Sequence, residues 1–218
     1  MERLQVRAVQ RAFDLLALVG AQSPPTLSEL ARAAALPVST AARLLSTLER
    51  AGFVHRNGEN RYAPGTRLVQ IGLSAMRSVS VYELAEPHLR RLSEASGETA
   101  NLAVRADAAN AVYLRQVVSP HSIHHASWLG RVLPLKKTAI GAAILGKAGA
   151  KGYVVRRDTL ERGVAAIAAP VRGAGGEIVA AFSITGPSYR IRAKEVERFG
   201  GLVSEEAQKA SRALGGSK

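Results

Sequence analysis

The residues best suited to chemistry with another molecule gather early in the chain, where Ser39, Thr40 and Arg43 lie within five residues. Hydroxyl and guanidinium groups suit nucleic acids, because an arginine fork bonds to phosphate oxygens or to the O6 and N7 atoms of guanine. The first lysine is Lys136, so arginine is the fixed cation of this whole region. We predict base or nearby phosphate contacts for Ser39, Thr40 and Arg43, and phosphate contacts for Arg56, Arg61, Arg7 and Arg11.

A helical frame must position these groups, and the flanking residues predict one. Thr26 and Glu29 have the spacing of a capping box, in which both side chains satisfy backbone N–H groups at a helix start. Leu36-Pro37 ends that helix, and Ser39-Thr40 is predicted to cap a second helix that ends at Gly52. The candidate contact residues would then lie at the start of the second helix.

A hairpin is predicted directly after the second helix. Residues 53–56 and 61–62 have strand character, and Asn57-Gly58 between them suits the positive φ angles of a tight turn. Helix, tight turn, helix and hairpin is the order of a winged helix-turn-helix, whose second helix enters the major groove of DNA. A competing use of Arg43 is an ion pair with Glu29 or Glu49 inside the helical unit.

Composition restricts the classes of protein and site that remain. The chain has 218 residues and a formal net charge of +13, which favours contact with a polyanion. It contains no cysteine, which excludes disulfides, zinc fingers, iron–sulfur clusters and thiol nucleophiles. No stretch has the apolar length of a signal peptide or a membrane span. We therefore expect a cytoplasmic protein without a membrane partner, a metal or a cofactor.

Three other motifs could carry chemistry, and the residues around each argue against it. Residues 141–147 resemble a phosphate-binding P-loop, but the next residue is alanine, where a serine or threonine would hold magnesium. His121, His124 and His125 have no acid within their segment to complete a metal shell. No Gly-x-Ser-x-Gly element marks a serine nucleophile. The sequence therefore predicts a protein that is not an enzyme.

After the hairpin, the pattern changes to strands flanked by helices. Alternating apolar residues predict strands whose connections are too short for repeated parallel crossovers, which favours an α+β class with an antiparallel sheet of the sensor type. We expect strands at 99–104, 111–117, 164–169 and 178–184, and helices from 66 onward, at 81–96, 138–145 and 194–214. We assign residues 1–64 to the winged unit, 65–80 to a linker helix and 81–218 to an effector-binding domain.

An ordered set of fragments resembles the IclR family of bacterial transcription regulators and covers nearly the whole chain. The fragments include residues 9–62, 97–100, 130–135, 138–141, 168–171 and 186–187. The resemblance implies a winged DNA-binding domain, a linker helix and a C-terminal effector domain related to GAF and PAS sensors. It also implies a dimer or a dimer of dimers, with double-stranded DNA and a small organic acid, sugar acid or aromatic compound as partners.

Two departures from the family pattern concern the effector domain. Similar proteins carry a longer, mostly helical segment between the motif that ends at Gly141 and the one at Gly152-Tyr153, so the pocket here is expected to be more open, or smaller and rebuilt. Arg156 and Ala166 stand where similar proteins offer an acid and a cysteine to the ligand.

The resemblance also implies which residues line the effector pocket. Besides Arg156 and Ala166, they are His125, Leu133, Ala139, Ile140, Ser183 and Thr185, with Trp128 near the same wall. An apolar cavity with few polar groups suits a small ligand. Because a guanidinium pairs bidentately with a carboxylate, Arg156 predicts an anionic effector. The alternative is that Arg156 and Arg157 point to solvent at a strand end.

The sequence thus predicts a transcription regulator, repressor or activator, that binds a pseudo-palindromic operator as a homodimer or homotetramer. A small organic-acid or aromatic effector in the C-terminal domain would control it. Two alternatives stay open: a DNA-binding regulator whose shortened sensor binds no ligand, and an enzyme that uses the winged unit for assembly. The second alternative has no acid-base or nucleophile constellation to support it.

Overall fold

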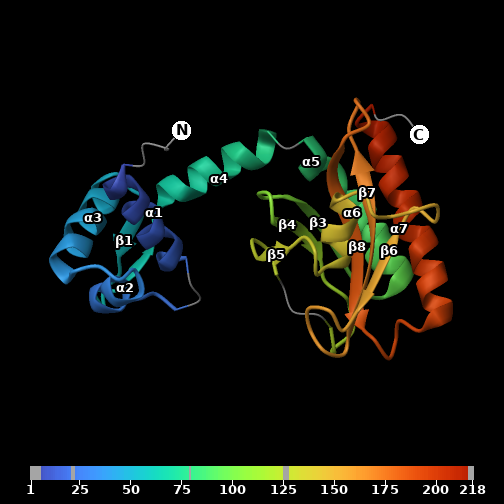
Figure 1. The fold of residues 1–218 in the computed structure, drawn as a ribbon, viewed down its shortest axis with the longest axis horizontal. Coiled ribbons are helices and arrows are strands. Elements are labelled where there is room, and N and C mark those ends of the chain that lie inside the picture. Colours follow the sequence, from blue (N-terminus) through green and yellow to red (C-terminus); the bar gives the residue numbers. More distant parts are fainter. Residues whose placement is uncertain (1–5, 21–22, 79, 125–127, 216–218) are drawn as a thin grey trace. The chain divides into compact units, whose positions relative to one another are not determined.

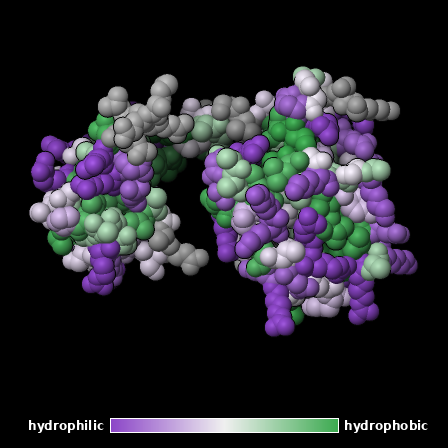
Figure 2. All heavy atoms as spheres, in the orientation of Figure 1, coloured by the Kyte–Doolittle hydropathy of each residue, from purple (hydrophilic) through white to green (hydrophobic). Residues whose placement is uncertain are grey.

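The chain folds into two compact units. The computed structural model describes residues 6–20, 23–78, 80–124 and 128–215. The units are Met1–Ser78 and Val79–Lys218, and Figure 1 shows the helices and strands of each. On the face shown in Figure 2, hydrophilic side chains alternate with hydrophobic patches over both units. None of the helices in the described ranges is long and apolar enough to cross a membrane.

The first unit is a helix-turn-helix followed by a hairpin and a further helix. Its elements are α1 (Arg7–Val19), α2 (Leu27–Ala33), α3 (Val38–Arg50), β1 (Val54–Arg56), β2 (Tyr62–Pro64) and α4 (Thr66–Ser78). Leu15, Leu30 and Leu45, one from each of the first three helices, are buried in a single core that also contains Val54 and Tyr62 of the hairpin. This shared core fixes α3 against α2 and the hairpin.

The predicted capping box at the start of α2 is confirmed. The backbone N–H of Glu29 donates to Thr26 Oγ1 at 3.3 Å, and the backbone N–H of Thr26 donates to Glu29 Oε2 at 2.7 Å. The hydrogen bond from the Thr26 backbone, followed by that from its hydroxyl, lowers the pKa of the Glu29 carboxyl. The charged carboxylate therefore holds the helix start in place at neutral pH.

Two local predictions in this unit are wrong. Helix α3 begins at Val38 with Pro37 as its N-cap, so that Ser39 and Thr40 lie inside the first turn and do not cap it. The hairpin turn is longer than Asn-Gly, because the Asn57 side-chain oxygen accepts the backbone N–H groups of residues 59 and 61, both at 3.0 Å. The positive φ falls on Asn60, at 57°, and not on the glycine. A side chain bonded to its own loop therefore sets this turn.

The second unit is an antiparallel sheet with helices on both faces, which confirms the predicted α+β class. The strand order is β5-β4-β3-β8-β7-β6. The two outermost strands, β5 and β6, are short and were not among the predicted elements. The elements are α5 (Ser80–Ser96), β3 (Thr99–Arg105), β4 (Asn110–Val117), β5 (Val132–Pro134), α6 (Ala139–Ile144), β6 (Val154–Arg157), β7 (Val164–Arg172), β8 (Ile178–Pro187) and α7 (Ala193–Ala213).

Alternation along each strand sends side chains to two separate cores. Phe182 and Ile184 of β8 pack with α5 and α7 on one face of the sheet. Ala181 packs with α6 on the other face, and Ser183 and Thr185 share its parity. Helix α6 therefore covers one face of the sheet and α5 and α7 cover the other (Figure 1). The hydroxyl-bearing residues of β8 therefore face the α6 side.

Candidate nucleic-acid interface and sensor cavity

The first turns of α3 present the predicted contact residues on one surface. Ser39 and Arg43 are exposed and lie one helical turn apart, while Thr40 between them is half-buried. Ala41 and Leu45 are fully buried on the opposite side of the helix. Helix α3 thus packs through one face and offers a hydroxyl and a guanidinium on the other.

The acids considered as partners of Arg43 bind other arginines. Glu49 Oε1 lies 3.2 Å from Arg56 Nε, and Glu29 Oε2 lies 3.5 Å from Arg61 Nη1. Within the described residues, Arg43 takes part in no ion pair. Its guanidinium is therefore available to a partner outside the unit.

The two hairpin arginines are held partly by their own unit. The hydrogen bond to Glu49 raises the pKa of Arg56, whose side chain remains 49% exposed. Arg61 Nη1 donates to the carbonyl oxygen of Pro24 at 3.0 Å. Each guanidinium keeps further N–H donors for a phosphate. Arg7 and Arg11, one turn apart on α1, are exposed as well.

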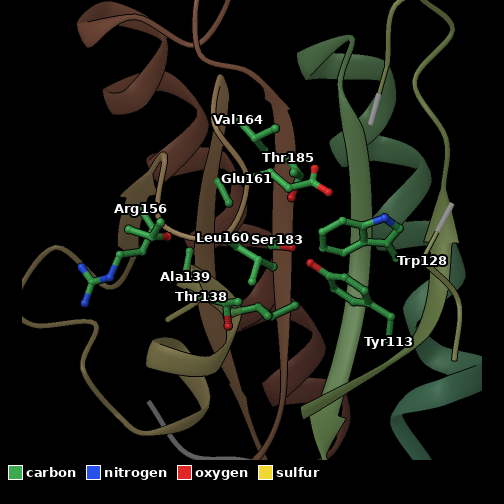
Figure 3. A pocket seen from close by; sticks show the side chains of 13 residues that line it. Tyr113, Trp128, Thr138, Ala139, Arg156, Leu160, Glu161, Val164, Ser183 and Thr185 are labelled. Atoms are coloured by element: carbon green, nitrogen blue, oxygen red, sulfur yellow. The ribbon is translucent and has the colours of Figure 1, made fainter. Parts of the chain in front are cut away.

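A cavity on the α6 side of the second unit brings together most of the predicted effector-binding residues. We call it the sensor cavity, and its volume is about 40 Å³. Figure 3 shows side chains that surround it. The lining residues are Tyr113, Trp128, Thr138, Ala139, Ile140, Arg156, Thr159, Leu160, Glu161, Val164, Ala166, Ser183 and Thr185.

Two of the predicted lining residues are not placed there. Leu133 on β5 is buried in the core beneath α6, and it is not among the residues that line the cavity. His125 lies outside the described residues. The residues that sequence reasoning missed are Tyr113, Thr138, Val164 and the loop residues 159–161.

Aromatic side chains form one wall of the sensor cavity. The rings of Tyr113 and Trp128 have centroids 6.5 Å apart at an interplanar angle of 44°. Arg131 stacks over the indole, with its guanidinium carbon 3.8 Å from the ring centroid. Cation–π stacking and ring contacts of this kind fix an aromatic surface for a ligand.

Neutral polar groups form the floor of the cavity. Asn101 Nδ2 donates to Ser183 Oγ and to Thr185 Oγ1, both at 3.3 Å, and Gln116 Nε2 donates to Asn101 Oδ1 at 2.7 Å. Burial raises the pKa of Tyr113 to about 12, although hydrogen bonds with Ser183 and Thr185 offset part of the rise. The phenol therefore stays protonated at neutral pH, and the floor offers hydroxyls rather than charges.

Arg156 does not carry its charge into this cavity. Figure 3 shows its guanidinium directed away from Tyr113, Trp128 and Ser183. Its Nη1 donates to the carbonyl oxygen of Val155 at 3.2 Å. The ionisable residues among the lining side chains include the acid Glu161. The half-buried Arg156 therefore lines the cavity without directing its guanidinium at the hydroxyl floor.

Comparison with known proteins places both units in one family. The IclR helix-turn-helix domain model matches residues 8–58, and the model of the bacterial transcriptional regulator IclR C-terminal domain matches residues 73–149 and 145–212. The transcriptional repressor IclR of Escherichia coli is 29% identical over 252 residues, which cover 98% of this chain and 92% of that protein. The regulator BhcR of Paracoccus denitrificans is 30% identical, covering 94% of this chain and 86% of that protein.

Solved structures agree with these matches. The Thermotoga maritima IclR structure has a TM-score of 0.75 at 26% identity, covering 97% of this chain and 100% of that chain. An IclR-type regulator from Alicyclobacillus acidocaldarius has a TM-score of 0.83 at 25% identity, with the same coverage.

The comparisons also show where this chain is shorter than its relatives. The alignment with the Escherichia coli repressor spans 252 residues, whereas this chain has 218. The C-terminal family model matches in two parts that meet at residues 145–149, in the connection between α6 and β6. The missing length therefore falls in that connection.

Since family models match both units over most of the chain, the protein belongs to the IclR family and is a DNA-binding transcriptional regulator.

Proposed function

We propose that the protein acts in the cytoplasm as a homodimer on a pseudo-palindromic operator, and that a small organic molecule in the sensor cavity changes its affinity for DNA. The observation that carries the DNA-binding part is the exposed Arg43 beside Ser39 at the start of α3, which forms no ion pair with the residues that the structure describes. In a helix-turn-helix, the start of the second helix meets base edges in the major groove. Two-fold symmetry then places one such helix in each half-site.

An apolar stripe on α1 supports the dimer. Val6, Val9 and Phe13 follow helical spacing and are 66%, 50% and 60% exposed. Exposed apolar side chains aligned in this way favour burial against a second protein surface. We propose that this surface belongs to a second copy of the chain, since a palindromic operator requires two recognition helices.

The lining of the sensor cavity supports a small, largely neutral or weakly polar aromatic effector. Its aromatic wall and hydroxyl floor suit a ring that carries hydroxyl groups. An IclR homologue from Microbacterium hydrocarbonoxydans, 21% identical, was crystallised in complex with 4-hydroxybenzoate. A cavity of about 40 Å³ is too small for such a ring, so its walls must open on binding. The same small volume favours the alternative of a regulator whose sensor takes no ligand.

Duplexes selected by the purified protein from a random pool are expected to share an inverted repeat. Each half-site should contain a guanine at one position, because a guanidinium pairs bidentately with that base. The measurement is sequencing of the selected pool, followed by gel shifts with selected and scrambled duplexes at physiological salt. Equal affinity for the two duplexes would overturn sequence-specific regulation.

The hairpin arginines are expected to act differently from Arg43, since phosphate contacts carry no sequence information. Arg56→Gln or Arg61→Gln should weaken binding to selected and scrambled duplexes alike and flatten the salt slope by about one unit per lost contact. Titrations at several salt concentrations measure this slope. Arg90→Gln, which removes an exposed arginine from α5 of the second unit, is the matched control. Unchanged slopes in both hairpin variants would place the wing away from DNA.

A further inference from the structure

A second cavity lies where the family's long connecting segment is missing. We call it the connection cavity; its volume is about 440 Å³, within the range of small-molecule sites. It shares no lining residue with the sensor cavity. Its lining residues are Gly146, Ala148, Gly149, Gly152, Ala169, Pro170, Arg172, Ser204, Gln208, Ser211 and Arg212.

Three structural features leave this space open. Strand β6 pairs with β7 only as far as Ala168, so the following residues of β7 have no β6 partner. The short connection turns through glycines with positive φ, including Gly146 at 74° and Gly149 at 60°. Gly152 approaches α7 so closely that a Cβ there would lie 2.5 Å from Ser204 Oγ. Backbone, strand edge and helix thus border a space that none of the described side chains fills.

The wall formed by α7 is polar and regular. Ser204, Gln208, Ser211 and Arg212 follow the spacing of one helix face. Ser204 and Ser211 are buried, and Ser211 Oγ accepts the backbone N–H of Arg172 at 2.8 Å. This bond ties α7 to the end of β7 that extends beyond β6. The Ser211 hydroxyl therefore joins two walls of the cavity, and Ser204 and Ser211 both line the space that a ligand would occupy.

The charges on the cavity wall have one sign. Arg172 and Arg212 belong to the lining, and none of the described lining residues is an acid. Arg172 Nη1 donates to the carbonyl oxygen of Gly176 at 2.8 Å, which anchors its guanidinium and leaves other donors. Lys147 and Lys151 stand on the same short connection. Two guanidinium groups without a lining acid create a positive potential inside a concave surface.

We propose that the connection cavity binds a small organic anion through a carboxylate or phosphate group held by Arg172 and Arg212. Guanidinium groups pair bidentately with both kinds of oxyanion, and the hydroxyl of Ser204, which accepts a hydrogen bond from Gln208 Nε2 at 3.4 Å, adds a neutral donor. The site lies beside the connection at which the family model matches this chain in two parts. It is separate from the sensor cavity and does not depend on an aromatic effector.

Isothermal titration of the full chain with citrate and with inorganic phosphate tests the proposal, and glycerol serves as the neutral probe. Citrate or phosphate should bind, and glycerol should not. Arg172→Gln and Arg212→Gln should each weaken binding on the order of five- to tenfold, because a charge-assisted contact is lost at a partly solvated site. Lys194→Gln, which removes an exposed charge from the first turn of α7 outside the cavity, should leave the affinity unchanged.

Two controls separate this site from the others. Melting temperatures of the variants show that the arginine changes do not unfold the unit. Trp128 is the single tryptophan and lines the sensor cavity, so its fluorescence reports occupancy of that cavity. The proposal is overturned if neither anion binds at millimolar concentration, or if the double arginine variant binds as tightly as the parent chain. DNA binding enters none of these readouts, so a failure here is distinguishable from a failure of the proposed function.

Discussion

Replacing Arg43 with alanine is expected to lower the affinity for the selected operator by about a hundredfold or more, and to remove most of the preference over scrambled DNA. One bidentate contact with a base is worth about 1–3 kcal/mol, and a dimer makes it in both half-sites. Arg43 is exposed, and the nearby acids Glu29 and Glu49 are bound to hairpin arginines. Fluorescence anisotropy with both duplexes at one salt concentration measures the two affinities.

Two further variants control for charge and position. Arg50→Ala removes the same charge from the last turn of α3 and should reduce the affinity for both duplexes by a similar, small factor. Arg43→Lys keeps the charge but loses the planar fork, so the affinity for scrambled DNA should persist while the preference falls. If Arg43→Ala bound the operator as tightly as the parent and Arg50→Ala did not, the recognition surface would lie at the other end of α3.

The winged unit was largely predictable because its signals are local. The capping box at Thr26 and Glu29 depends on four consecutive residues, and its geometry follows from their spacing alone. The error at Ser39 and Thr40 has a similar local cause: Pro37 supplies the extended residue before the helix, and the hydroxyls that looked like caps fall inside it. The pairing of acids with the hairpin arginines was not predictable, since it joins residues that meet only after folding.

The sensor cavity was less predictable because its walls come from different elements. Arg156, Ala166 and Thr185 occupy one row across three strands, so the family resemblance placed all three at the cavity. Arg156, however, stands on the edge strand β6. The stem of its long side chain can pack along that edge while its guanidinium reaches water, as arginine side chains commonly do.

Some of the missed lining residues left a signal and others did not. Tyr113 lies two residues after Ala111 on β4 and therefore on the same face, so strand parity could have placed its ring on the α6 side of the sheet. Thr159, Leu160 and Glu161 belong to the loop between β6 and β7. Loop residues follow no period, and only the folded structure brings them to the cavity.

Ala166→Leu is expected to abolish the response to an aromatic effector while leaving DNA binding without effector intact. Ala166 is a half-buried lining residue, and three added carbon atoms would occupy most of a cavity of about 40 Å³. Overpacking of this kind costs about 1–3 kcal/mol in a closed core, so a melting curve must show that the variant is folded. The measurement is the release or recruitment of operator DNA, together with Trp128 fluorescence, during titration with benzoate and its hydroxylated derivatives.

Arg156→Gln is the matched variant for this experiment, because it lies across the same strand pair from Ala166. Its guanidinium points away from the cavity, so the effector concentration that gives half of the response should change by less than about twofold. A large loss in Arg156→Gln with a normal response in Ala166→Leu would show that the arginine turns inward to hold an anion. If the parent chain gave no response to any of these compounds, the regulator would act without this class of ligand. The response of these two variants therefore decides between a hydroxyl-lined aromatic site and an arginine-held anion.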